Sequence, residues 1–95
     1  MRLDDKIKLF FKQSIDKNIQ GSKLYLFGSR ANNEALGGDI DLMILTNEPI
    51  NKTIFRAIRM EFYKQFGWQK IDLINFTFSD NSAFKQLIIT NAIEL

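Results

Sequence analysis

The chain has 95 residues, a length that fits one domain around one modest hydrophobic core. Because it contains no cysteine and no histidine, we exclude disulfides, thiolate metal sites and histidine-based acid–base chemistry, so any metal site must be built from oxygen. A net charge of +2 is too small to argue for nucleic acid as a direct substrate. We see no signal peptide and no apolar run of membrane-spanning length, and we therefore expect a cytoplasmic protein.

Helical patterns occupy three parts of the chain. Apolar residues recur at helical spacing over 3–19, and Gly21 follows as a stop signal. A second amphipathic pattern covers 55–66 and ends at Gly67. A final helix is expected over 84–92, after the candidate caps Ser79, Asp80 and Ser82.

Strand patterns alternate with the helices. The apolar runs 23–27, 40–45 and 69–75 predict three strands, with a short helical segment after the first and a proline-containing loop after the second. The order α-β-α-β-α-β-α predicts a small sheet with helices packed on it, an α/β or α+β fold in a single domain over residues 1–95.

The first predicted strand ends abruptly at a glycine. Gly28 allows a tight backbone turn and the close approach of a phosphate. Ser29 can donate a hydrogen bond to a phosphate oxygen, and Arg30 can add charge-assisted donors. The segment is compatible with a nucleotide-binding turn, although a lone Gly-Ser pair after a strand is more often an ordinary turn.

Three carboxylates accompany this turn. Asp39 and Asp41 are two residues apart on a predicted strand, so their side chains share one face at a spacing of ~6.6 Å. At that distance they repel by roughly 2–3 kcal/mol at an effective dielectric of ~20. Asp72 lies in another apolar run. The acids fit a site for Mg²⁺, or for Mn²⁺, that acts in phosphoryl transfer, whereas each acid alone is compatible with an exposed sheet face.

Taken together, these motifs resemble those of the minimal nucleotidyltransferases of the DNA polymerase beta superfamily. The matching segments are Gly28-Ser29, then Asp39-Ile40-Asp41-Leu42, and later Ile71-Asp72-Leu73. The resemblance implies a mixed sheet in which the Gly-Ser strand and the Asp-x-Asp strand are adjacent and antiparallel.

The resemblance also implies an activity and a partner. Asp39, Asp41 and Asp72 would be the catalytic, metal-binding residues, and Gly28, Ser29 and Arg30 would bind ATP or another NTP. Members of this family commonly accompany a HEPN-domain toxin as its antitoxin, and some transfer AMP to it. A homo-oligomer or a hetero-oligomer is compatible with this role.

One departure from the family pattern keeps an alternative open. The spacer from Arg30 to Gly38 has nine residues, one fewer than the usual pattern. The alternative is a catalytically inactive module that neutralises its partner by contact. A small nucleic-acid-binding domain fits less well, because the chain lacks a dense basic patch.

Other residues have two interpretations. Lys52, Arg56 and Arg59 are expected on the helix face away from the Phe55-Ile58-Phe62 stripe, as a solvated face or as a contact for phosphate or an acidic partner. Tyr63 and Trp68 are expected to pack at the edge of the core rather than to stack on a base. Ile89 and Ile93 are expected outside the buried arc of the final helix, as a strip for a partner or as terminal packing.

Overall fold

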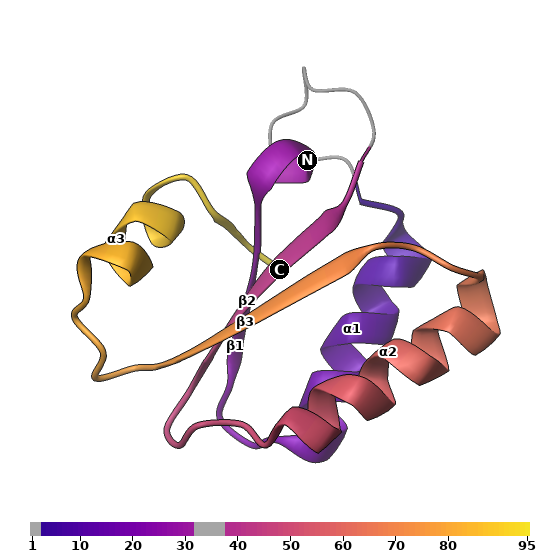
Figure 1. Cartoon of the computed structure of the whole chain (residues 1–95), viewed down its shortest axis with the longest axis horizontal. Coiled ribbons are helices and arrows are strands. Elements are labelled where there is room, and N and C mark those ends of the chain that lie inside the picture. The colour runs from indigo at the N-terminus through magenta and orange to yellow at the C-terminus, as the bar shows by residue number, and fades with distance from the viewer. Residues whose placement is uncertain (1–2, 32–37) are drawn as a thin grey trace.

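The computed structural model describes residues 3–31 and 38–95, and the side chains of Ser29 and Arg30 are not described (Figure 1). In chain order, the elements are α1 (Asp5–Asn18), β1 (Lys23–Phe27), the 3-10 helix η1 (Gly28–Ala31), β2 (Ile40–Thr46), α2 (Lys52–Phe66), β3 (Ile71–Thr77), α3 (Ala83–Thr90) and β4 (Ile93–Glu94).

The strands form one mixed sheet in the order β3-β2-β1-β4. β1 pairs antiparallel with β2 and with β4, whereas β2 pairs parallel with β3. The parallel pair needs a crossover connection, which α2 provides. The predicted mixed sheet flanked by helices is confirmed, as is the antiparallel pairing of the Gly-Ser strand with the Asp-x-Asp strand.

The main core lies between the sheet and the two longer helices. Figure 1 shows α1 and α2 on one side of the sheet and α3 on the other. Alternate residues of β2 (Ile40, Leu42 and Ile44) are fully buried against Phe11 and Phe62 of the helices. This alternation sends Asp41, Met43 and Leu45 to the opposite face. The helix-facing layer is therefore apolar, and the predicted site lies on the other face.

Side-chain caps fix where the helices begin. Asp4 accepts from the Lys6 backbone N–H at 2.7 Å, and Asn51 accepts from the Thr53 N–H at 2.9 Å. Ser82 accepts from the Lys85 N–H at 3.3 Å, so one of the three predicted caps serves α3. Each cap satisfies a backbone donor that has no partner inside its helix.

The structure corrects the prediction for the C-terminal segment. α3 ends at Thr90, and Ile93 lies in the short strand β4, paired with Leu26 of β1. The large apolar residues exposed on α3 are Phe84 and Leu87, whereas Ile89 is half-buried. The expected strip of Ile89 and Ile93 on the helix is therefore wrong, because the chain leaves the helix to cover the open edge of β1. The other interpretation, terminal packing, describes Ile93.

Two aromatic expectations have different outcomes. Tyr63 packs against the core as predicted, with its ring 6.2 Å from that of Phe62. Trp68 is 78% exposed, and the prediction that it packs at the core edge is wrong. It follows Gly67, whose φ of +85° turns the chain away from α2 before β3 begins.

Candidate active site

The candidate site begins where β1 turns into η1. Leu24 and Leu26 bury their side chains in the core and hold β1 in place. Gly28 follows with φ +71°, a conformation that residues with a Cβ rarely adopt. The sharp turn therefore occurs at the glycine that the sequence indicated.

Gly28 also lies against a carboxylate. A Cβ at this position would overlap Asp41 Oδ2 and lie 3.1 Å from Asp41 Cγ. The register agrees, because Phe27 is directly opposite Asp41 on the paired strands. The missing side chain thus lets the backbone turn and the Asp41 carboxylate share one small space.

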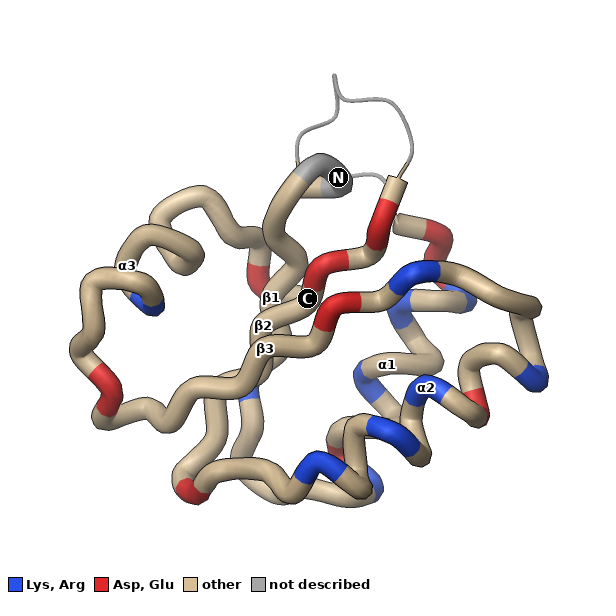
Figure 2. The backbone as a smooth tube through the Cα atoms, viewed as in Figure 1, with Lys and Arg blue, Asp and Glu red and all other residues tan. Residues whose placement is uncertain are grey.

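Asp41 and Asp72 come together from neighbouring strands. They are register partners in the parallel β2–β3 pair, and the acidic positions of the two strands lie side by side in Figure 2. The pKa of Asp41 is raised to about 6, mainly by partial burial and then by the hydrogen bond with Asp72 and the charges of Asp72 and Asp39, while Lys70 acts in the opposite direction. Asp41 therefore keeps its proton up to about pH 6, because protonation relieves the repulsion from the neighbouring carboxylates.

Asp39 has a different neighbour. It immediately precedes β2, and its Oδ2 lies 3.3 Å from Nζ of Lys70, at the start of β3. A hydrogen bond to Asp39 raises the pKa of Lys70 above its usual value. Gln69 Nε2 donates to the Gly38 carbonyl at 3.1 Å and ties the same two segments together.

The charges near the acids bear on metal binding. In residues 3–31 and 38–95, no group of three histidine, cysteine, aspartate or glutamate side chains is arranged to hold a metal. Asp41 and Asp72 nevertheless fit a hard divalent cation in chemistry, because both supply oxygen and a cation would relieve their repulsion. For Asp39 to join them, its carboxylate would have to leave Lys70.

Two sequence predictions at this site concern residues that the structure describes only in part. The backbones of Ser29 and Arg30 lie in η1, directly after Gly28, so the short segment expected after β1 is a 3-10 helix. Residues 32–37, which make up most of the nine-residue spacer, lie outside the described residues.

A hollow lies beside the turn. It has a volume of about 660 Å³ and is lined by Phe27, Gly28, Ala31, Leu87, Ile88 and Asn91. A groove of similar volume lies between α2 and β3, and its lining includes none of the three acids. The lining of the first hollow includes none of the three acids either, but it contains Gly28, which lies against Asp41, so we place the candidate site there.

Sequence reasoning missed Lys70 at this site. Its position two residues before Asp72 on the same strand was the available signal. The contact between Lys70 and Asp39 depends on the β2–β3 register, which residue spacing along the chain does not predict.

Together, a glycine turn packed on a carboxylate and a second carboxylate on the adjoining parallel strand define a domain of nucleotidyltransferase type. The match to a family model agrees: residues 5–95 match the family described as polymerase beta, nucleotidyltransferase, and the chain belongs to that family.

Solved structures share the fold. A crystal structure from Shewanella oneidensis has a TM-score of 0.70 and 16% identity, covering 98% of this chain and 71% of that one. A mutant of the toxin-antitoxin MntA-HpeT has a TM-score of 0.67 and 16% identity, covering 88% of this chain and 67% of that one. No curated protein sequence matches the chain. Over the part of the chain that the structure describes, no helix is both long and apolar enough to cross a bilayer.

Proposed function

We propose that the chain is a magnesium-dependent nucleotidyltransferase that moves an NMP group, AMP from ATP, to a hydroxyl of a protein partner. The observation that carries the proposal is the placement of Asp41 against both Gly28 and Asp72. Two carboxylates that repel each other do not stabilise the fold, so their contact indicates a functional role rather than a structural one. Family membership supports the same chemistry.

The residues of the chain divide the work in this proposal. The turn at Gly28, with Ser29 and Arg30, would hold the β- and γ-phosphates. Asp41 and Asp72 would hold Mg²⁺ or Mn²⁺, with Asp39 added when it leaves Lys70. The bound cation would neutralise charge on the phosphates and favour loss of the hydroxyl proton.

The reaction itself is a single displacement. The acceptor oxygen bonds to the α-phosphorus, the bond from that phosphorus to the bridging oxygen breaks, and pyrophosphate leaves. Asp72 would assist removal of the proton from the attacking hydroxyl. Positioning and charge supply most of the acceleration in such reactions, so a partner that presents its hydroxyl completes the site.

The proposed partner is a HEPN-domain toxin, which this chain would neutralise as an antitoxin. The support is the sequence resemblance and the fold shared with the toxin-antitoxin MntA-HpeT. We extend the proposal to a cytoplasmic location, because ATP, the proposed donor, is abundant there.

One observation favours a second candidate, the inactive binding module. Lys70 neutralises Asp39, so one of three expected ligands is engaged by the protein itself. In this alternative, the fold neutralises the partner through surface contact alone.

Co-expression with the protein encoded next to this chain separates the two candidates. The partner is weighed by intact mass spectrometry after expression with the wild type or with Asp39→Ala/Asp41→Ala. The enzyme predicts a gain of one or more nucleotidyl units with the wild type only. An unmodified partner that both forms neutralise equally would establish the binding module.

A further inference from the structure

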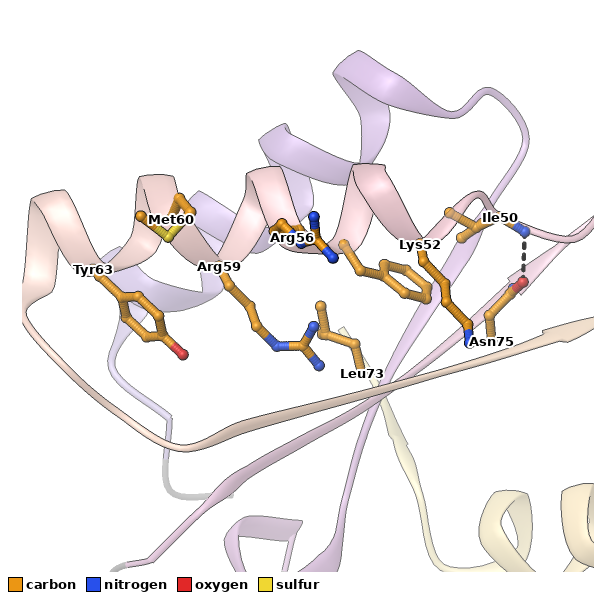
Figure 3. Close-up of a pocket in the computed structure, with 9 residues that line it drawn as sticks. Ile50, Lys52, Arg56, Arg59, Met60, Tyr63, Leu73 and Asn75 are labelled. Atoms are coloured by element: carbon orange, nitrogen blue, oxygen red, sulfur yellow. Dashed lines mark hydrogen bonds between the residues drawn. The ribbon is translucent and has the colours of Figure 1, made fainter.

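A second surface lies away from the candidate active site, between α2 and the edge strand β3. This groove has a volume of about 690 Å³. Figure 3 shows Lys52, Arg59 and Tyr63 reaching from α2 toward β3, with Leu73 beneath them. The groove follows the length of α2, so it suits an elongated occupant.

Three cations line the α2 side of the groove. Lys52, Arg56 and Arg59 have no ion-pair partner among the residues described, and the lining contains no acidic side chain. Lys52 and Arg56 are one helical turn apart, ~6 Å along the axis. In an extended chain, alternate side chains are ~6.6 Å apart, which matches this spacing. Acidic residues at alternate positions of an extended segment would therefore meet both cations.

The floor of the groove is apolar. Leu73, Phe55 and Tyr63 pack against the core but stay partly open, and Met60 is 53% exposed. The face of α2 that carries the three cations therefore adjoins Phe55. The expectation that this face lies away from Phe55 is wrong. A floor of this kind favours an occupant that has apolar side chains between its acidic ones.

β3 offers backbone groups to the same occupant. It is the edge of the sheet on this side, and the Lys70 carbonyl accepts from the Ile40 N–H of β2 at 3.0 Å. Alternation turns the next carbonyl, that of Ile71, outward, where it accepts from Arg59 Nε at 3.2 Å. Further along β3, beyond Arg59, the backbone N–H and C=O groups of Leu73 and Asn75 point outward in the same way. An added strand would pair with them.

We propose that this groove docks an extended acidic segment of a protein partner, in which acidic and apolar residues alternate, as an added strand beside β3. The proposal extends the proposed function, resting on it only for the expectation of a protein partner. Nucleic acid would satisfy the cations but would leave the apolar floor and the strand edge unused.

The test is an NMR titration of the labelled chain with a synthetic peptide that alternates Glu and Leu. We expect saturable shifts at the Leu73 and Asn75 amides. The counterpart peptide with Gln in place of Glu should bind about tenfold more weakly. Lys52→Glu/Arg56→Glu should weaken binding of the Glu peptide by about tenfold. Met60→Asp should also weaken this binding, because it places a charge in the apolar floor of the groove.

Matched controls isolate the groove. Lys12→Glu/Lys17→Glu makes the same change in net charge on exposed positions of α1 and should leave binding within about twofold. Asp41→Ala should also bind the peptide normally, so a failed transferase does not remove this result. Thermal melts confirm that each variant is folded.

Three results would overturn the proposal. These are absence of binding to the Glu peptide, equal loss in the α1 control, and tighter binding of oligouridylate than of the Glu peptide. The last would assign the cations to nucleic acid.

Discussion

Asp41 of β2 and Asp72 of β3 are register partners whose carboxyl groups share a hydrogen bond, and Gly28 closes the space on the other side of Asp41. This contact disfavours the doubly charged state that metal binding would require. It therefore links stability, protonation and function at one pair of residues.

The pair predicts an unusual pH dependence for the metal-free protein. The pKa of Asp41 is raised to about 6 from an ordinary 3.8, so the folded chain binds more protons than the unfolded chain between these values. The free energy of unfolding should therefore fall as pH rises from about 4 to 6. Asp41→Asn should remove this slope and stabilise the protein near pH 7 by about 1 kcal/mol, a value reduced for solvent screening. Urea titrations at several pH values measure both, and an unchanged slope in the variant would refute the assignment.

Gly28→Ala should be costly for two separable reasons. The new Cβ would adopt a φ of +71° and would overlap the Asp41 carboxylate. We expect a loss of about 1–3 kcal/mol in unfolding free energy. Gly21→Ala is the matched control, because Gly21 has the same φ and its nearest neighbour, Asn47 Nδ2, would be 3.6 Å away.

The overlap itself can be isolated by a double-mutant cycle. If it contributes, Gly28→Ala should cost less in an Asp41→Ala background than in the wild type. Equal costs in the two backgrounds would leave backbone strain as the whole effect.

Lys70→Met tests whether this lysine competes with a cation. Since Lys70 Nζ lies 3.3 Å from Asp39 Oδ2, its removal should free Asp39 and strengthen Mg²⁺ binding by about fivefold, the scale of one exposed ion pair. Melting temperatures across a Mg²⁺ series report this affinity, because binding to the folded state raises stability by mass action. Lys64→Met, which breaks the pair with Glu61 on α2, is the control. Weaker Mg²⁺ binding by Lys70→Met would contradict the competition.

Lys85→Met tests a structural lysine. Lys85 is 6% exposed, and its Nζ donates to the carbonyls of Thr77, Phe78 and Asp80 at 3.2, 3.0 and 2.6 Å. Its loss leaves these carbonyls without their charged donor and should cost about 2–3 kcal/mol. Chemical denaturation measures the change, and a loss under about 0.5 kcal/mol would show that water replaces the lysine.

The sequence predicted those parts of the fold that depend on local pattern. Helical spacing and apolar runs located α1, α2 and the three longer strands, because those elements bury a continuous face. β4 was missed, since two residues have no periodicity and pair only through the distant β1. The third strand was placed two residues too early, and it extends to Thr77.

The candidate site shows the same division. Gly28, Asp41 and Asp72 were named from their motifs, and the register brings them together. The attachment of Asp39 to Lys70 and the groove beside Arg59 depend on how β3 aligns with its neighbours. Residue spacing along one chain does not specify that alignment. The catalytic and metal-binding roles remain predictions.

The most direct test of the central claim is transfer of label from α-labelled ATP to the co-purified partner. The wild type should incorporate label in a reaction that requires Mg²⁺ or Mn²⁺, and Asp41→Ala should lose at least about a hundredfold of the transfer with its fold intact. Wild-type transfer by Asp41→Ala would exclude Asp41 from the reaction.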